Sequence, residues 1–158
     1  MRSKLSIAVL IVLAVAGGVL LPSSANGQTV IHVVFGPQYA TRVFDVDGGG
    51  LRLGDRIAAR GPLFDETQTE RLGTSYAHCL VARRIVDPAQ GLWNCNYVLE
   101  LADGDIMLQG LDPRGAGVYE MSVFGGTGAY AGATGDATFT DVGTADDAYT
   151  DMVIRLGK

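Results

Sequence analysis

From Thr29 onward the sequence consists of short β-prone runs separated by Gly, Asp and Pro, and no stretch has the apolar period of a helix. Alternation is clearest in residues 94–101, where one strand face would carry Cys95, Tyr97, Leu99 and Leu101. Asp103-Gly104 follows directly and is typical of a two-residue hairpin turn. The pattern predicts an all-β domain of antiparallel strands.

Nine such runs are expected as strands: Thr29–Val34, Tyr39–Val46, Arg56–Ala59, Thr74–Val86, Trp93–Leu101, Ile106–Leu111, Val118–Phe124, Ala137–Val142 and Tyr149–Leu156. The first two form one long strand if the chain bends at Gly36-Pro37, which leaves eight. Many short strands fit a sandwich or a barrel, and we expect the barrel because closure removes the exposed sheet edges. The sequence therefore predicts one eight-stranded antiparallel closed β-barrel domain at residues 28–158.

The first 27 residues have the order of a secretory signal peptide. Arg2 and Lys4 precede an uncharged, mostly apolar run at 5–21, and small residues suit cleavage after Ala25 or Gly27. An uncleaved anchor is the alternative, because the 17-residue run approaches the lower limit for crossing a bilayer. We expect a secreted, extracellular protein with no membrane attachment after cleavage.

Acidic residues outnumber basic ones by 17 to 12, and the net charge of −5 becomes −7 without Arg2 and Lys4. A surface of this charge repels phosphate groups, so nucleic acids and anionic membranes are not expected as partners.

Cys79 and Cys95 are the only cysteines, and an even number in an exported chain favours a disulfide. They lie in strand-like runs on either side of a turn expected at 87–91, so antiparallel pairing can bring them within bonding distance. A reactive thiol at Cys79 is the alternative. No metal site is expected, because the chain has no C-x-x-C motif and only two histidines, His32 and His78.

Residues 124–135, FGGTGAYAGATG, form a glycine-rich segment that invites comparison with a phosphate-binding loop. The segment lacks the Lys of such a loop, and a strand rather than a helix is expected after it, so a dinucleotide site is not indicated either. We interpret it as a tight structural connection and expect no cofactor.

Asp45 and Asp47 are two residues apart in an expected strand and therefore share one face with Val43. If that face is the barrel interior, burial and mutual repulsion would raise the pKa of at least one carboxyl group, as general acid catalysis near neutral pH requires. If the face points outward, both are ordinary hydrated carboxylates. The sequence leaves both orientations open.

The order of motifs resembles that of the allene oxide cyclase and dirigent superfamily of small β-barrels. Residues 71–81, RLGTSYAHCLV, are similar to the family's Arg-x-Gly-(five residues)-Cys strand, and 125–135 to its Gly-Gly-Thr-Gly turn followed by an aromatic residue and Gly-Ala-x-Gly. Further similar positions are Gly54-Asp55, the run from Trp93 to Asp103-Gly104, and Leu108-Gln109-Gly110. The resemblance covers about residues 41–156.

This resemblance implies an eight-stranded barrel with a hydrophobic cavity, often assembled as a trimer, that fixes the stereochemistry of ring closure or coupling without a cofactor or metal. Asp45 and Asp47 stand where plant cyclases carry a Glu-x-Asn pair, so the resemblance implies that Asp45 donates a proton and Asp47 orients the substrate oxygen. Both residues differ from the family pattern, and the Pro that follows it is absent. Tyr76, Tyr97 and Phe124 are expected to line the cavity.

The leading hypothesis is a secreted, cofactor-free barrel that binds a hydrophobic small molecule, either as an isomerase of the cyclase kind or as a dirigent-like protein, in a dimer or trimer. One alternative is a non-catalytic carrier with a wholly apolar cavity, and another is a structural or interaction module whose interior is filled. Inward carboxylates would favour the cyclase over the carrier.

Overall fold

The computed structural model describes residues 28–36, 40–45, 48, 52–83, 91–113, 117–143 and 148–157. The expected signal peptide at 1–27, Asp47 and most of the turn expected at 87–91 lie outside these residues. Within the described ranges, no helix has the length and apolar character needed to cross a membrane.

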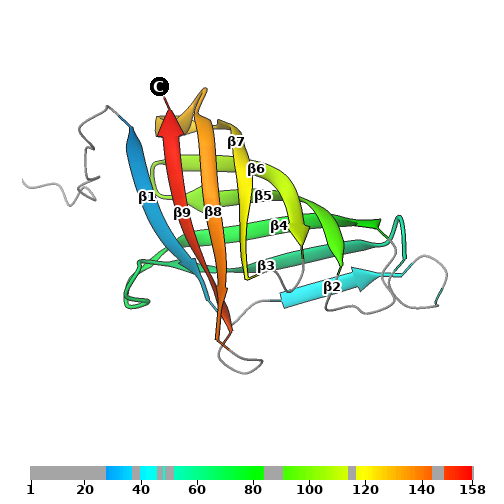
Figure 1. Cartoon of the computed structure of the whole chain (residues 1–158). Helices are drawn as coiled ribbons and strands as arrows, with labels where there is room; N and C mark the ends of the chain where they lie inside the picture. Colours follow the sequence, from blue (N-terminus) through cyan, green and yellow to red (C-terminus); the bar gives the residue numbers. More distant parts are fainter. Residues whose placement is uncertain are drawn as a thin grey trace, which may run out of the picture.

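The described residues form one antiparallel sheet of nine strands (Figure 1). The strands are β1 (Thr29–Phe35), β2 (Ala40–Phe44), β3 (Arg56–Phe64), β4 (Arg71–Arg83), β5 (Leu92–Leu101), β6 (Gly104–Pro113), β7 (Val118–Gly126), β8 (Thr134–Val142) and β9 (Tyr149–Gly157). A short 3-10 turn, η2 (Gly128–Tyr130), connects β7 to β8.

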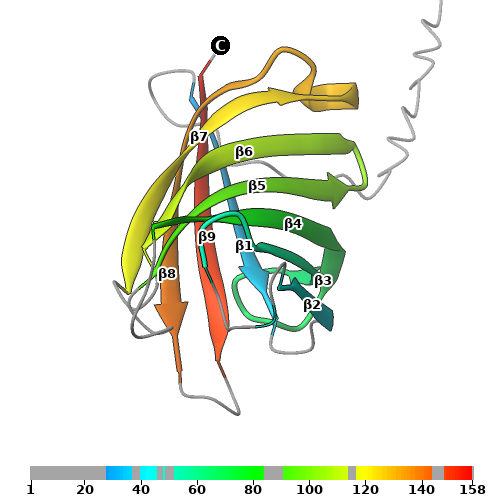
Figure 2. The same cartoon turned by 90° about the vertical axis from the view of Figure 1, so that its right-hand side faces the viewer.

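The sheet closes on itself because β3 pairs along both of its edges. One edge pairs with β4, while the other pairs with β2 near its start and with β1 near its end, through Val34–Phe64 and Phe35–Leu63. β1 and β2 thus follow one another along the same edge of β3, as two halves of a bent strand. Figure 2 shows β4 to β7 curving round one side of the barrel, while β1, β8 and β9 form the other. The predicted eight-stranded antiparallel barrel is confirmed, with β2 as an additional strand.

Alternate residues of the strands point inward and build one continuous core. The end of the barrel near η2 is densely filled by Leu63, Leu99 and Ile106, none of which is exposed, and by the buried ring of Tyr130 from η2 itself. The glycine-rich segment therefore acts as a structural connection that places an aromatic ring in the core.

Several observed strand limits differ by a few residues from the predicted ones, and two of these differences have a clear structural cause. The strand expected at Arg56–Ala59 continues to Phe64, since Pro62 is accommodated in β3 and its carbonyl oxygen accepts a hydrogen bond from the Gly36 N–H at 3.3 Å. The two-residue turn between β5 and β6 falls at 102–103 rather than at Asp103-Gly104, because Leu101 pairs with Gly104, which already belongs to β6.

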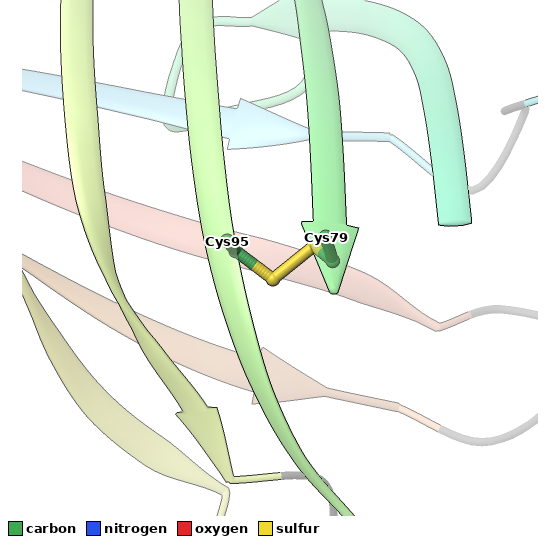
Figure 3. Close-up of a disulfide and its surroundings, with 2 residues drawn as sticks. All are labelled: Cys79 and Cys95. Carbon is green, nitrogen blue, oxygen red and sulfur yellow. A yellow bond between two sulfur atoms is a disulfide. The ribbon is translucent and has the colours of Figure 1, made fainter. Parts of the chain in front are cut away.

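The predicted disulfide between Cys79 and Cys95 is present and joins β4 to β5 (Figure 3). The two residues lie directly opposite each other, with a Cα–Cα distance of 4.1 Å, and both are buried in the core. The bond leaves no free cysteine among the described residues, so the alternative of a reactive thiol at Cys79 is not supported.

We predict that reducing this disulfide lowers the free energy of unfolding by about 3 kcal/mol, which the chain-entropy model gives for cysteines 16 residues apart. Urea unfolding with and without reductant measures the difference, and the Cys79→Ala/Cys95→Ala variant should show a similar loss without reductant. Two alkylatable thiols in the unreduced, unfolded protein would contradict the prediction.

Two adjacent glycines at the end of β7 have very different surroundings. A Cβ atom at Gly126 would lie 2.5 Å from the Tyr130 carbonyl oxygen and 2.6 Å from that of Asp105, whereas one at Gly125 would meet only the Met107 sulfur at 3.9 Å. Close backbone approach therefore requires glycine at 126, while Gly128 combines such an approach with a φ of +55°.

We predict that Gly126→Ala lowers the free energy of unfolding by more than about 2 kcal/mol, because two backbone segments must separate to admit the methyl group. Gly125→Ala is the matched control and should stay within about 1 kcal/mol of the wild type. Equal stabilities of the two variants in urea unfolding would show that the close approach is unimportant.

Candidate functional site

A cavity of about 270 Å³ lies inside the barrel, at the end where β8 leads into β9. Its lining includes inward-facing residues of β3 to β9, together with residues of β1, β2 and the β8–β9 connection. Six aromatic side chains contribute: Phe35, Trp93, Tyr97, Tyr119, Phe139 and Tyr149. The interior of this barrel is therefore not completely filled.

Small residues on two neighbouring strands keep the cavity open. Ala59 of β3 lies directly opposite Ala77 of β4, and Ala77 lies opposite Tyr97 of β5. All three line the cavity. Larger side chains at the two alanines would occupy the space between the wall and the aromatic residues across the barrel, so these alanines determine how much room a ligand has.

Three aromatic rings form a compact cluster around Phe139, whose side chain is fully buried. The Tyr97 and Tyr119 rings each lie with their centroids 5.2 Å from that of Phe139, the first tilted by 54° and the second nearly stacked at 24°. Ring pairs at this separation stabilise one another beyond the area they bury. The cluster gives the cavity a rigid aromatic wall.

Two carboxylates also line the cavity. Asp112, at 6% exposure, lies opposite Trp93 in the β5–β6 ladder and has the inward orientation of Ile106 and Leu108 on the same strand. Asp141 lines the cavity nearer to the exposed rim, where its Oδ1 accepts a hydrogen bond from the Thr150 hydroxyl at 3.0 Å. The cavity is thus aromatic but not wholly apolar.

The Tyr119 hydroxyl is held in its protonated form. Burial raises the pKa of this phenol far above its usual value, and its interaction and hydrogen bond with Tyr97 and the nearness of Asp112 and Asp141 raise it further. The phenol remains a neutral hydrogen-bond donor at any physiological pH. A donor of this kind can stabilise negative charge that develops on an oxygen atom.

Of the three predicted ligand-binding residues, one faces the interior of the barrel and two face outward. Tyr97 lines the cavity, as expected. Tyr76 is 39% exposed and Phe124 53% exposed, and neither lines the cavity. The expectation that these two line it was wrong, because inward and outward residues alternate and their neighbours Ala77 and Val123 take the inward positions. On the outer face, the Tyr76 hydroxyl donates to Glu100 at 3.1 Å.

Asp45 lies immediately after the end of β2, exposed, with its Oδ1 accepting a hydrogen bond from the Gly48 N–H at 2.7 Å. The ladder shows that Val43, on the same strand face, pairs with the inward residue Ile57. The face shared by Val43 and Asp45 is thus the inner one, but the strand ends before Asp45, and this residue is absent from the cavity lining. Asp47 lies outside the described residues.

Four residues that shape the cavity were not predicted from the sequence: Trp93, Asp112, Tyr119 and Phe139. The alternation 95–97–99–101 already places Trp93 on the same face as Tyr97. A disulfide requires both cysteines on one face, which puts Ala77 inside and Tyr76 outside. Within the described chain, no group of three or more His, Cys, Asp or Glu side chains could hold a metal ion.

Comparison with known proteins supports the fold. No family model and no curated protein sequence matches the chain. Among solved structures, it is similar to a pyocyanin demethylase (TM-score 0.64, 23% identity, 81% of this chain and 99% of that one). It is also similar to a pterocarpan synthase dirigent protein (TM-score 0.65, 17% identity, 82% of this chain and 94% of that one). A third similar structure is an exo-specific intermolecular Diels-Alderase (TM-score 0.61, 17% identity, 81% of this chain and 98% of that one). The expected dirigent and cyclase type of barrel is therefore confirmed as a fold.

We predict that Tyr119 does not ionise in the folded protein below about pH 12, since deprotonation would place a charge in a buried, acidic cavity. In absorbance titrations of native protein up to that pH, Tyr119→Phe should match the wild type, whereas in urea the variant should lack one titrating phenol. Because the native pKa lies above the unfolded value of about 10, this proton stabilises the fold below pH 10, and the contribution is lost as pH rises further. A smaller native titration in the variant would contradict the assignment.

Proposed function

We propose that this protein is a secreted, cofactor-free barrel that binds a hydrophobic small molecule and directs its ring closure or coupling. The observation that carries the proposal is the cavity itself, in which a permanently protonated phenol, Tyr119, and a buried carboxylate, Asp112, stand beside an aromatic wall. The fold shared with a dirigent protein and a Diels-Alderase supports this reading. An isomerase of the cyclase kind is the enzyme class that fits best.

Containment supplies the main physical effect. A flexible substrate that is confined in about 270 Å³ loses most of its conformations before reaction, and this removes much of the entropic barrier to ring closure. The asymmetric lining, with Ala59 and Ala77 on one side and Phe139 on the other, admits one folded shape in preference to its mirror image. Product stereochemistry then follows from the shape of the cavity.

The polar groups would act on a substrate oxygen. Tyr119 and Tyr97 are hydrogen-bonded to each other, so the hydroxyl that accepts this bond keeps its own O–H free to donate to a substrate oxygen placed beside the pair. A carbonyl or epoxide oxygen gains negative charge as its neighbouring bonds rearrange, and this hydrogen bond strengthens as it does. In this proposal Tyr97 and Tyr119 replace Asp45 and Asp47 as the residues closest to the reacting atoms.

We predict that Ala59→Phe weakens binding of the neutral dye N-phenyl-1-naphthylamine by more than about tenfold, because the new ring occupies the cavity. Dye fluorescence measures the affinity, and thermal unfolding verifies that the variant folds. Ala58→Phe is the matched control, since Ala58 directly precedes Ala59 on β3 and does not line the cavity. Equal affinities of the two variants would place the dye outside the barrel.

A panel of linear polyenes carrying a ketone or an epoxide extends the test to chemistry, with products separated by chiral chromatography. Stereocontrol predicts an enantiomeric excess that Ala58→Phe retains and Ala59→Phe loses. Tight dye binding without any excess from the panel would favour the carrier, whereas a wild-type protein that binds no dye would favour the module with a filled interior.

A further inference from the structure

Three neighbouring strands carry a local excess of positive charge in this acidic protein (Figure 1). The strands β2, β3 and β4 contain no Asp or Glu, and their charged or titratable residues are all basic and exposed: Arg42, Arg56, Arg60, Arg71, His78 and Arg83. The net charge of −5 therefore does not describe this part of the outer wall.

The pairing of the strands places four of these residues around one small side chain. Ala58 on β3 lies opposite Arg42 on β2 and opposite His78 on β4. Arg56 and Arg60 lie two residues before and after it on β3, so they share its outward face. Paired residues are about 5 Å apart, and residues two positions apart along a strand are about 7 Å apart. These four side chains thus surround a single point above Ala58, and we call the group the arginine site.

The arginine charges of this site are permanent, because a guanidinium group is not deprotonated in proteins. The side chains of Arg42 and Arg56 form no ion pair or hydrogen bond with any other described residue. Arg60 lies over the Tyr76 ring, with its guanidinium carbon 5.6 Å from the ring centroid. This contact orients the guanidinium group without removing its charge.

The described carboxylates near the arginine site lie at its border. Asp45, Asp55 and Glu100 accept hydrogen bonds there from the Gly48 N–H, the Arg52 N–H and the Tyr76 hydroxyl, respectively. The row of paired residues through Ala58 continues on β5 and β6 with Asn96 and Gln109, which are uncharged. The centre of the site therefore attracts anions.

The number of donors favours a phosphate monoester over a carboxylate as the ligand. A terminal phosphate carries close to two negative charges at neutral pH and has three acceptor oxygens, whereas a carboxylate has one charge and two oxygens. Guanidinium groups also match phosphate in geometry, since they donate two parallel hydrogen bonds to it. The exposed side chains of Phe44 and Leu80 flank Arg56 on the two neighbouring strands, so an apolar substituent on the phosphate finds contacts beside the charges.

We propose that the arginine site binds small phosphate monoesters that carry an aromatic or other apolar substituent. The phosphate group lies above Ala58, and the substituent lies against Phe44 or Leu80. The neighbouring residues Ala59 and Ala77 line the cavity, so the arginine site occupies the opposite face of the same wall. This inference is therefore independent of the proposed function of the cavity.

The direct test titrates three probes of nearly equal shape and different charge into isotopically labelled protein at pH 7.5, followed by amide chemical shifts. Phenyl phosphate carries about two negative charges at this pH, phenyl sulfate carries one, and phenyl methanesulfonate carries none. We expect phenyl phosphate to shift the amides of Ala58, Arg60 and His78. It should bind at least about threefold more tightly than phenyl sulfate, and phenyl methanesulfonate should leave these amides unshifted.

Variants locate the site. Arg42→Gln removes one charge from a side chain without other described contacts and should weaken the binding of phenyl phosphate at least about fivefold. Arg83→Gln is the matched control, since it changes the net charge equally at the exposed end of β4 and should alter the affinity less than about twofold. Ala58→Glu places a carboxylate at the centre of the site and should abolish binding there.

Several results would overturn the proposal. An equal loss of affinity in Arg42→Gln and Arg83→Gln would attribute binding to overall charge. Equal binding of phenyl methanesulfonate at the same amides would show that charge is unimportant, and shifts confined to Tyr119 and Phe139 would place phenyl phosphate in the cavity. Binding to vesicles that contain phosphatidic acid, without binding of phenyl phosphate, would identify a lipid surface instead. Each of these results leaves the proposed function of the cavity intact, because that function is tested separately by the dye.

Discussion

The pairing of β3 with β4 on one edge and with β1 and β2 on the other closes the sheet, and the rest of the structure depends on this closure. A closed sheet gives each strand one inward face, so a side chain's position in the alternation decides whether it meets the core or solvent. At one end of the barrel the inward positions hold large side chains and the Tyr130 ring. At the other end Ala59 and Ala77 leave space, and the cavity results.

The polarity of that space is as important as its size. A carrier for neutral hydrophobic molecules would be expected to have an apolar lining, because a buried carboxylate is costly unless something interacts with it. Here Asp112 stands opposite Trp93 and close enough to Tyr119 to help keep that phenol protonated. The carboxylates and the phenol make the lining partly polar, which supports the proposed role in ring closure or coupling over that of a passive container. The disulfide, whose Cys79 lines the cavity, fixes β4 to β5 beside this site.

The sequence was sufficient for the barrel, for most strand positions and for the disulfide, because alternation and turn residues are local signals. It failed where tertiary context decides. Pro62 stays within β3, since its carbonyl oxygen accepts a hydrogen bond from the Gly36 N–H. The strand that was expected to include Asp45 ends one residue earlier, at Phe44. Tyr76 and Phe124 were predicted to line the cavity because they are aromatic, but both are exposed. For Tyr76 on β4, the disulfide already indicated this, because Cys79 faces inward and Tyr76, three residues away, faces the opposite side. Asp112 carried no recognisable motif, and only its register against Trp93 reveals it.

The central claim is that this barrel keeps a ligand-sized space among Trp93, Tyr97 and Phe139. The most direct measurement is a crystal structure of the protein soaked with 1-bromonaphthalene, in which anomalous scattering locates the bromine atom without reference to any assumed pose. We expect a bromine peak inside the barrel, between the aromatic wall and the Ala59–Ala77 pair. A barrel whose side chains fill this space, or bromine peaks confined to the outer wall, would contradict it.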